Sequence, residues 1–391
     1  MDRFAIAVLS TVVLLSGWTS PSAGAPSATG QERVPVRGAI KIKWPNPEFR
    51  TLQSAIDAAP EGATVEIQQG AYKLDQPIFV RKSLTIQGAG SGRNGQRQIT
   101  HLVGPQPHRV IDEAGNLILR AEAVQGVLNF IGADSVVRDI QISGFDAGIV
   151  QRDDAVGKSA RLVVTDAHID NTGRGILSMA SDHLIVTDST ICEQLCLWNA
   201  ISAKSPNLLK ALILEIVDNY IAGPLGAGIY VENTTMTIKD VYIQGALGGA
   251  IVGLQSVANI EDSTLHGNYK AGIIFLDSTV AATNNLIDIT FGVGQSAFGD
   301  GIDLFRSGSY LADNVVTHSD RVGVGFYMGA SGFLQGNQIT CCGLFDILVE
   351  NSTGNVAIDG GANSCGCADF PRPCEVHGNV LSAPEPVGGL E

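Results

Sequence analysis

The apolar residues of this chain recur in a repeated triplet of a small residue, a glycine and an isoleucine or valine. Several successive copies are 22 residues apart, as from Ile251 to Ile273 and from Ile302 to Val324. Clear triplets begin at Ala147, Arg174, Ala227, Ala271, Asp300 and Val322, and looser copies end at Ile201, Ile251 and Ile347. A constant period of this length predicts a solenoid, in which each repeat stacks on the next.

A second pattern keeps the same phase along the chain. An aspartate or asparagine stands three residues before an apolar residue in the pairs Asp139/Ile142, Asp166/Ile169, Asp188/Ile191, Asp218/Ile221, Asp240/Ile243, Asp262/Leu265, Asn284/Ile287 and Asp313/Val316. We interpret these polar residues as turn residues whose side chains bind backbone groups. Short runs with alternating apolar residues lie between the two patterns, as in Thr235–Ile238, and such runs predict strands.

One repeat is too short for a helix, a strand and two loops, but it has room for three short strands and three turns. Each repeat is then one coil whose inner residues stack on those of its neighbours, and insertions leave only through the turns. The sequence therefore predicts an all-β fold, a single-stranded right-handed parallel β-helix of roughly ten coils.

Residues 51–59 have the pattern of a short amphipathic helix. Leu52, Ala55, Ile56 and Ala59 fall on one helical face, and Pro60 follows. The first coil of a solenoid exposes its core and its strand edges, so we expect this helix to cap that end.

The run from Thr51 to Ile67, followed by Gly70–Tyr72, resembles the N-terminal cap of the pectin-lyase-like right-handed β-helix superfamily. The later coils resemble its Asn/Asp-x-x-Ile and Gly-Ile repeats, over roughly residues 48 to 365. This resemblance implies the fold. It does not imply one activity, because the superfamily includes lyases, hydrolases, epimerases, tailspikes and non-catalytic periplasmic proteins.

The beginning of the chain has the pattern of a secretory signal peptide. Arg3 precedes an apolar run that ends near Leu15, and Ala23-Gly24-Ala25 matches a cleavage site. The run is too short to span a membrane, so we expect a secreted or periplasmic protein without a membrane anchor. The expected organisation is a signal peptide at 1–25, a partly disordered leader at 26–47, the β-helix at 48–383 and a loose tail at 384–391.

The net charge is −14, from 25 basic and 39 acidic residues. A strongly acidic exported protein is a poor match for nucleic acid and for anionic membranes. The expected partner is a polysaccharide, on the grounds of export, a groove-forming solenoid and the aromatic and Asp/Arg residues described below. A polyanionic glycan would need a bound cation or local arginines to offset the charge of the protein.

Seven cysteines are present, and export permits disulfides. We expect Cys192 and Cys196 to pair locally. We also expect disulfides to hold the C-terminal end together among Cys341, Cys342, Cys365, Cys367 and Cys374. The odd count leaves one thiol over, and the adjacent Cys341 and Cys342 either form a vicinal pair or point to opposite faces of a strand. A zinc site that includes Cys365, Cys367, Cys374 and His377 is an alternative, although Cys-x-Cys is an unusual ligand spacing.

The longest step of the repeat, from Ile273 to Ile302, predicts an inserted loop at 290–298, and loops on a rigid scaffold often carry function. Eight of the 23 aromatic residues fall between residues 291 and 345. Aromatic faces stack on sugar rings, although most of these rings are expected to be core residues. The residues expected to bind substrate beside the loop are Phe298, Arg306 and Tyr327.

Gly299-Asp300-Gly301-Ile302-Asp303 resembles the Asn-x-Asp-Gly-Ile-Asp signature of the polygalacturonases. These enzymes carry an Asp-Asp pair one coil later, where this chain has Asp320-Arg321, and their Gly-His-Gly and Arg-x-Lys motifs are missing. An inverting hydrolase needs a carboxylic acid and a carboxylate base. The broken pattern leaves a simpler reading open, in which Asp-Gly-Ile is one copy of the coil motif.

A uronate lyase would use the same residues differently. Asp300, Asp303 and Asp320 would hold Ca²⁺ to neutralise the substrate carboxylate, and Arg321 or His318 would act as the base. The catalytic candidates are therefore Asp300, Asp303, Asp320, Arg321 and His318.

Two classes of function stay open. One is an exported enzyme, a lyase or hydrolase of a uronic-acid-containing glycan. The other is a non-catalytic β-helix that binds a glycan, a surface or an assembly partner. Converging aspartates and arginines in an open groove would favour the enzyme, and a groove lined by apolar or small residues would favour binding.

Overall fold

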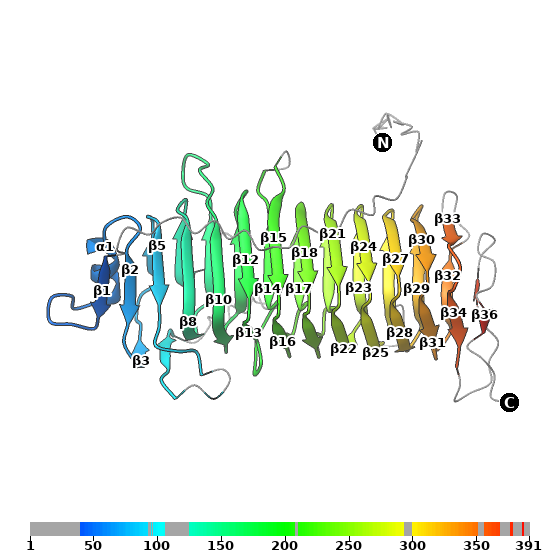
Figure 1. Ribbon diagram of the computed structural model, residues 1–391, viewed down its shortest axis with the longest axis horizontal. Coiled ribbons are helices and arrows are strands. Elements are labelled where there is room, and N and C mark those ends of the chain that lie inside the picture. The colour runs from blue at the N-terminus through cyan, green and yellow to red at the C-terminus, as the bar shows by residue number, and fades with distance from the viewer. Residues whose placement is uncertain are drawn as a thin grey trace, which may run out of the picture. The chain divides into compact units, whose positions relative to one another are not determined.

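The computed structural model describes residues 40–92, 95, 97–105, 125–207, 210–292, 299–350 and 356–367, with the backbone of 376–377 and 385–386. Over these residues the chain is a right-handed parallel β-helix (Figure 1), as predicted. Three rows of parallel strands run along it, which we call faces A, B and C in chain order within a coil. Faces A and B together form one 24-stranded sheet, and face C is a separate sheet of 12 strands, so there are more coils than the expected ten.

Face A consists of one strand from each coil. Its strands are β1 (Lys41–Trp44), β2 (Thr64–Ile67), β5 (Leu84–Gln87), the first parts of β8 (Ser135–Ser143) and β10 (Leu162–Asp170), β12 (His183–Thr187), β15 (Leu212–Val217), β18 (Thr234–Lys239), β21 (Val257–Glu261), β24 (Thr279–Thr283), β27 (Gly308–Ala312), β30 (Ser331–Gln335) and β33 (Val356–Asp359).

In most coils, face B follows after a corner of two residues. Its strands are β3 (Gly70–Lys73), β6 (Thr100–Val103), the last parts of β8 and β10, β13 (Thr190–Ile191), β16 (Tyr220–Ala222), β19 (Tyr242–Gln244), β22 (Thr264–Tyr269), β25 (Leu286–Phe291), β28 (Val315–Ser319), β31 (Gln338–Thr340), β34 (Ser364–Gly366) and β36 (Glu385–Pro386).

Face C carries the Gly-Ile triplets. Its strands are β4 (Ile78–Val80), β7 (Gly126–Ile131), β9 (Ala147–Arg152), β11 (Arg174–Met179), β14 (Ile201–Lys204), β17 (Ile229–Glu232), β20 (Ile251–Leu254), β23 (Ala271–Leu276), β26 (Asp300–Phe305), β29 (Val322–Tyr327), β32 (Phe345–Val349) and β35 (Val376–His377). The predicted anchors stack in register, with Ile251 beside Ile273, Ile273 beside Ile302, and Ile302 beside Val324.

The polar pattern of the sequence lies at the corner between faces A and B. The eight aspartate and asparagine residues, from Asp139 to Asp313, all adopt the left-handed conformation with φ between 47° and 56°. Among non-glycine residues, Asp and Asn tolerate this conformation best, so the predicted turns are confirmed, whereas the binding of backbone groups by these side chains stays a prediction.

In five of the eight corners the residue after the turn residue is a serine or an asparagine whose side chain hydrogen-bonds the backbone of the corner. Buried asparagines stack there in the last coils. Asn314 Nδ2 donates to the Ala282 carbonyl (2.8 Å) and to Asn337 Oδ1 (2.9 Å), and Asn314 Oδ1 accepts from the Asn285 amide (3.1 Å). We call the stack of Asn285, Asn314, Asn337 and Asn363 the asparagine ladder.

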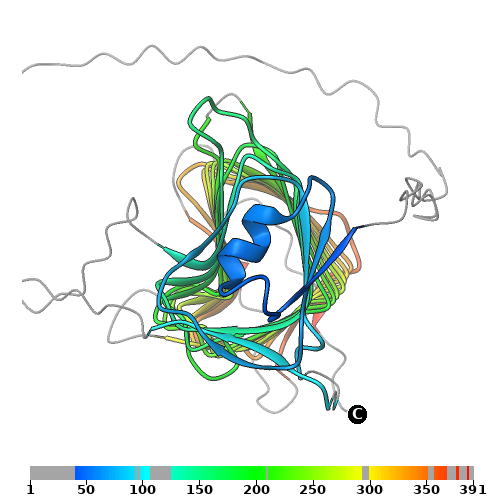
Figure 2. The ribbon, with the colours of Figure 1, turned by 90° about the vertical axis from the view of Figure 1, so that its left-hand side faces the viewer.

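The helix α1 (Leu52–Ala58) covers the N-terminal end of the coils, as predicted (Figure 2). A capping box between Thr51 and Ser54 starts it, and its face of Leu52, Ala55 and Ile56 is buried. Among the described residues no helix is long and apolar enough to cross a membrane.

The ends of the solenoid differ from the expected boundaries. Lys41–Trp44 was assigned to the leader but pairs with Thr64–Ile67 as strand β1, and Glu385–Pro386 of the expected tail pairs with β34. The predicted signal peptide and most of the leader lie outside the described residues.

Two disulfides lie within the described residues. Cys192 pairs with Cys196, and Cys341 pairs with Cys367 on the next coil. Cys365 is also disulfide-bonded, and Cys374 lies outside the described residues. The expectation of a disulfide at Cys342 is wrong, because Cys342 is a buried free thiol and its neighbour Cys341 pairs with Cys367.

Candidate functional site

The outer surface of face C holds a cluster of polar side chains on two neighbouring coils. Asp300 and Asp303 come from β26, Arg321 directly precedes β29, and Tyr327 ends β29. The register of the two strands places Gly325 beside Asp303 and Tyr327 beside Phe305. Because one clean period separates the two coils, the predicted proximity of Asp300 and Arg321 is found in the structure.

The carboxylate oxygens of Asp300 are both hydrogen-bonded within the protein. Its side chain is 0% exposed, and its Oδ1 accepts from Arg321 Nε (2.7 Å) and from the Val322 amide (3.0 Å). Arg321 Nη2 donates to the other carboxylate oxygen. This pairing raises the pKa of Arg321, so the guanidinium stays charged. Asp300 therefore fixes the position of a cation that remains 26% exposed at the surface.

Asp303 is buried in a different way. It is 0% exposed, and neither carboxylate oxygen has a hydrogen-bond partner among the described residues. Burial, and next the charge of Asp300, raise the pKa of Asp303 well above its ordinary value. A carboxyl group in such surroundings keeps its proton, because ionisation would leave an unpaired charge away from water.

Tyr327 closes the cluster toward the solvent. Its ring stacks on Phe305 with the centroids 4.9 Å apart, and Arg321 Nη2 donates to its hydroxyl (3.2 Å). Burial and the two nearby carboxyl groups raise the pKa of Tyr327. The phenol is therefore held protonated, in a position where only 9% of the residue is exposed.

Two other candidates lie away from this cluster. Asp320 is exposed, and its Oδ2 accepts from the Gly292 amide (2.7 Å), so it binds the start of the predicted 290–298 loop. His318 lies on face B, where its Nδ1 is 3.3 Å from Asp288 Oδ1. Phe298 lies outside the described residues.

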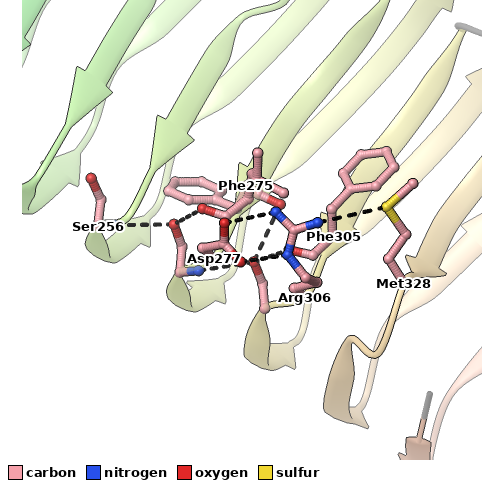
Figure 3. A network of polar contacts seen from close by, with 9 residues as sticks. Ser256, Phe275, Asp277, Phe305, Arg306 and Met328 are labelled. Carbon is pink, nitrogen blue, oxygen red and sulfur yellow. Dashed lines mark hydrogen bonds and ion pairs between the residues drawn. The ribbon is translucent and has the colours of Figure 1, made fainter. Parts of the chain in front are cut away.

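Arg306 lies at the corner between faces C and A, at the far end of β26 (Figure 3). Its Nε and Nη2 donate to the two carboxylate oxygens of Asp277 on the preceding coil (2.6 and 2.8 Å), and Nη1 approaches Met328 Sδ at 3.9 Å. The guanidinium is already engaged in this bidentate ion pair on the rim of face C.

The predicted calcium ligands do not fit a metal ion. Asp300 is paired with a guanidinium, Asp303 is held neutral, and Asp320 binds backbone. In the described part of the chain, no group of three or more His, Cys, Asp or Glu side chains is arranged to hold a metal. The same observation covers the described members of the alternative zinc set, Cys365 and Cys367.

The outer surface of face C around the cluster is apolar. Tyr230, Val252, Ile274 and Leu348 share the row of Asp303, and Leu254, Leu276 and Phe305 share the row of Tyr327. The polar cluster is therefore surrounded by apolar side chains on face C. The converging aspartates and arginine are the feature expected for an enzyme, and the apolar surroundings are the feature expected for a binding protein.

Sequence reasoning missed Gly325, although it helps to build the site. A Cβ at Gly325 would lie 2.4 Å from Tyr327 Cε2 and 2.6 Å from its hydroxyl. The signal was present as a second glycine in the run Val322-Gly-Val-Gly-Phe-Tyr327, at an outward position of the strand.

No protein-family model and no curated protein matches this chain. Among solved structures it is similar to the A-module of the mannuronan C-5 epimerase AlgE4 from Azotobacter vinelandii. The TM-score is 0.55 at 14% identity, over 86% of this chain and 94% of that chain. The periplasmic alginate epimerase AlgG gives a TM-score of 0.55 at 11% identity, over 84% of this chain and 83% of that chain. The chain has the right-handed β-helix fold of these proteins. At such identities the likeness concerns the fold alone.

Proposed function

We propose that this protein is exported and acts on a polysaccharide that contains uronic acid, by chemistry that begins at the C5 proton of the uronate. The observation that carries the proposal is the cluster of Arg321, Tyr327 and the neutral Asp303 on the outer surface of face C. The fold similarity to two alginate epimerases supports this substrate class.

The charges of the cluster suit a uronate better than a neutral sugar. Removal of the C5 proton places negative charge on the adjacent carboxylate, which must be neutralised. Arg321 supplies a permanent cation at the surface, fixed in direction by Asp300. Asp303, as a neutral acid, adds no negative charge that would repel the substrate.

Tyr327 is suited to donating a hydrogen bond. Its raised pKa keeps the phenol protonated, so the hydroxyl can donate to a substrate oxygen that gains negative charge. An elimination breaks the C5–H and C4–O bonds and forms a C4–C5 double bond, so it also needs a base for the C5 proton. Arg321, Tyr327 and Asp303 are all held protonated, so this cluster supplies the cation and the hydrogen-bond donors of such a reaction and not its base.

Hydrolysis fits the cluster less well. An inverting hydrolase needs a free carboxylate to activate water, opposite a carboxylic acid. Asp303 has the character of the acid, but the only adjacent carboxylate among the described residues, Asp300, is bound by Arg321 and the Val322 amide.

Non-catalytic glycan binding is the second candidate function. Both carboxyl groups are fully buried, and the surrounding strip of face C is apolar. These observations favour a surface that holds a polymer without reacting with it.

The test is an assay of the mature protein on alginate, polygalacturonate and a neutral glucan, with product read by ultraviolet absorbance of unsaturated ends and by NMR for inversion at C5. Tyr327→Phe removes one hydroxyl and should lower the rate by about 10²-fold or more. The matched control is Tyr310→Phe on exposed β27, which should retain the wild-type rate. Wild-type protein that changes none of these polymers but retains one of them would favour the binding function.

A further inference from the structure

Face B carries a second set of polar side chains, away from the cluster on face C. Four of the seven histidines, His101, His168, His266 and His318, lie on this face. On the coils from β16 to β28, we call the set of Tyr220, Tyr242, Gln244, His266, Asp288, Thr317 and His318 the face B track. The neighbouring core residues, such as Ile243 and Leu265, point inward, so the track points outward.

Direct contacts connect the members of the track from coil to coil. Tyr220 and Tyr242 stack with centroids 5.6 Å apart, and the Tyr242 hydroxyl donates to Gln244 Oε1 (3.0 Å). Asp288 lies between two histidines of the adjacent coils, with His266 Nδ1 3.2 Å from one oxygen and His318 Nδ1 3.3 Å from the other.

The network extends one coil further toward the C-terminal end. Thr317 Oγ1 is 3.1 Å from His318 Nδ1 and accepts a hydrogen bond from Thr340 Oγ1 (3.2 Å). Internal contacts of this kind hold each side chain in one orientation, so a ligand would lose little side-chain entropy on binding.

These groups remain accessible to a ligand. The exposed fractions of the side chains are 38% for His266, 25% for Asp288 and 54% for His318. Imidazole, amide and phenol groups donate and accept hydrogen bonds in the plane of the side chain, and a carboxylate accepts them, which suits the hydroxyl groups of a sugar ring.

The spacing of the track fits a linear polymer of sugars. Neighbouring coils present equivalent positions about 4.8 Å apart, and an extended chain of linked pyranoses advances by a similar distance per sugar. We infer that the face B track is a second polysaccharide-binding surface, on which the polymer runs along the solenoid and places about one sugar on each coil. This surface is independent of any chemistry on face C.

The experiment is affinity electrophoresis of the mature protein in gels that contain alginate or a neutral β-glucan. The variants Tyr242→Ala and His266→Ala should each weaken retention by at least tenfold, with unchanged circular dichroism. Thr237→Ala changes an exposed residue on face A of the same coil as Tyr242, and Tyr310→Phe changes an exposed tyrosine on face A of a later coil. Both controls should be retained like wild type.

Retention by both polymers would indicate recognition of shared hydroxyl groups, and retention by alginate alone would add recognition of the carboxylate. Either result supports the inference when the gel no longer retains the two face B variants. Wild-type protein that neither gel retards, or face B variants that are retarded like wild type, would overturn it, whatever the outcome of the activity assay.

Discussion

The ring of Tyr327 occupies the space that a side chain at Gly325 would fill. A Cβ at Gly325 would stand 2.4 to 2.6 Å from three atoms of the Tyr327 side chain, closer than any unstrained contact. Gly325 also lies beside Asp303 in the register of β26 and β29. The absence of one side chain thus lets the phenol lie against Arg321 and above a buried carboxyl group.

Gly325→Ala should therefore displace the Tyr327 ring while leaving the backbone of β29 in place. We expect the free energy of unfolding to fall by about 1–2 kcal/mol from overpacking, and any turnover to fall as far as in Tyr327→Phe. Denaturant unfolding and the product assay measure the two effects. The control is Gly308→Ala, where a Cβ meets nothing within 4 Å. Equal behaviour of the two alanine variants would contradict the role of Gly325.

Asp303 should make stability depend on pH. Its pKa is raised in the folded state, so the folded protein binds one more proton than the unfolded chain over the window that starts near pH ~4 and ends at the folded pKa. The free energy of unfolding from this group is then greatest below that window and falls by about 1.4 kcal/mol per pH unit across it.

Asp303→Asn should remove this slope, because the amide does not titrate. Urea unfolding of both proteins at a series of pH values upward from about 4 gives the comparison. The same slope in the variant and the wild type would show that Asp303 ionises in the folded protein.

Asn314→Ala should strongly destabilise the C-terminal coils. It removes the donors to the Ala282 carbonyl and Asn337 and the acceptor for the Asn285 amide, and it leaves these buried groups unsatisfied. We expect a loss of about 3 kcal/mol, measured by denaturant unfolding. Asp313→Asn, at the adjacent left-handed corner residue, should change stability by less than about 0.5 kcal/mol. A loss as large in Asp313→Asn would point to the corner itself rather than to the ladder.

Cys342 should react with thiol reagents only after unfolding. It is buried, and burial raises the pKa of its thiol, so little thiolate forms in the folded protein. Mass spectrometry after labelling with and without denaturant locates the modified residue, and Cys341 and Cys367 should be labelled only after reduction. Labelling of Cys342 in the native protein would contradict its buried position.

The coils could be predicted because the inward-facing residues of successive coils must recur at one common spacing in order to stack. Ile273, Ile302 and Val324 must stack, so the spacing shows in the chain, and the nearness of Arg321 to Asp300 follows from it. The corner aspartates were found for a similar reason, since few residue types accept a positive φ.

Side-chain direction within a coil was harder to predict. Asp320 and Arg321 are adjacent, yet one binds the Gly292 amide and the other pairs with Asp300. His318 adopts a positive φ of 55° and lies beside Asp288 on face B. Periodicity predicts the coil on which a residue lies, but the backbone conformation at one corner residue decides on which face of that coil the residue lies. The burial of Asp303 also depends on Tyr327 from the neighbouring coil, which composition does not encode.

The asparagine ladder has a direction and a defined last member. All four ladder amides donate to a carbonyl of the preceding coil, as Asn314 does to Ala282 and Asn363 to Leu334 (both 2.8 Å). Those of Asn285, Asn314 and Asn337 also donate to the next asparagine, whereas the second hydrogen bond of Asn363 Nδ2 goes to Asp359 Oδ1 (2.6 Å). Among the described residues, the amide stack therefore ends at a carboxylate of its own coil and not at a further amide.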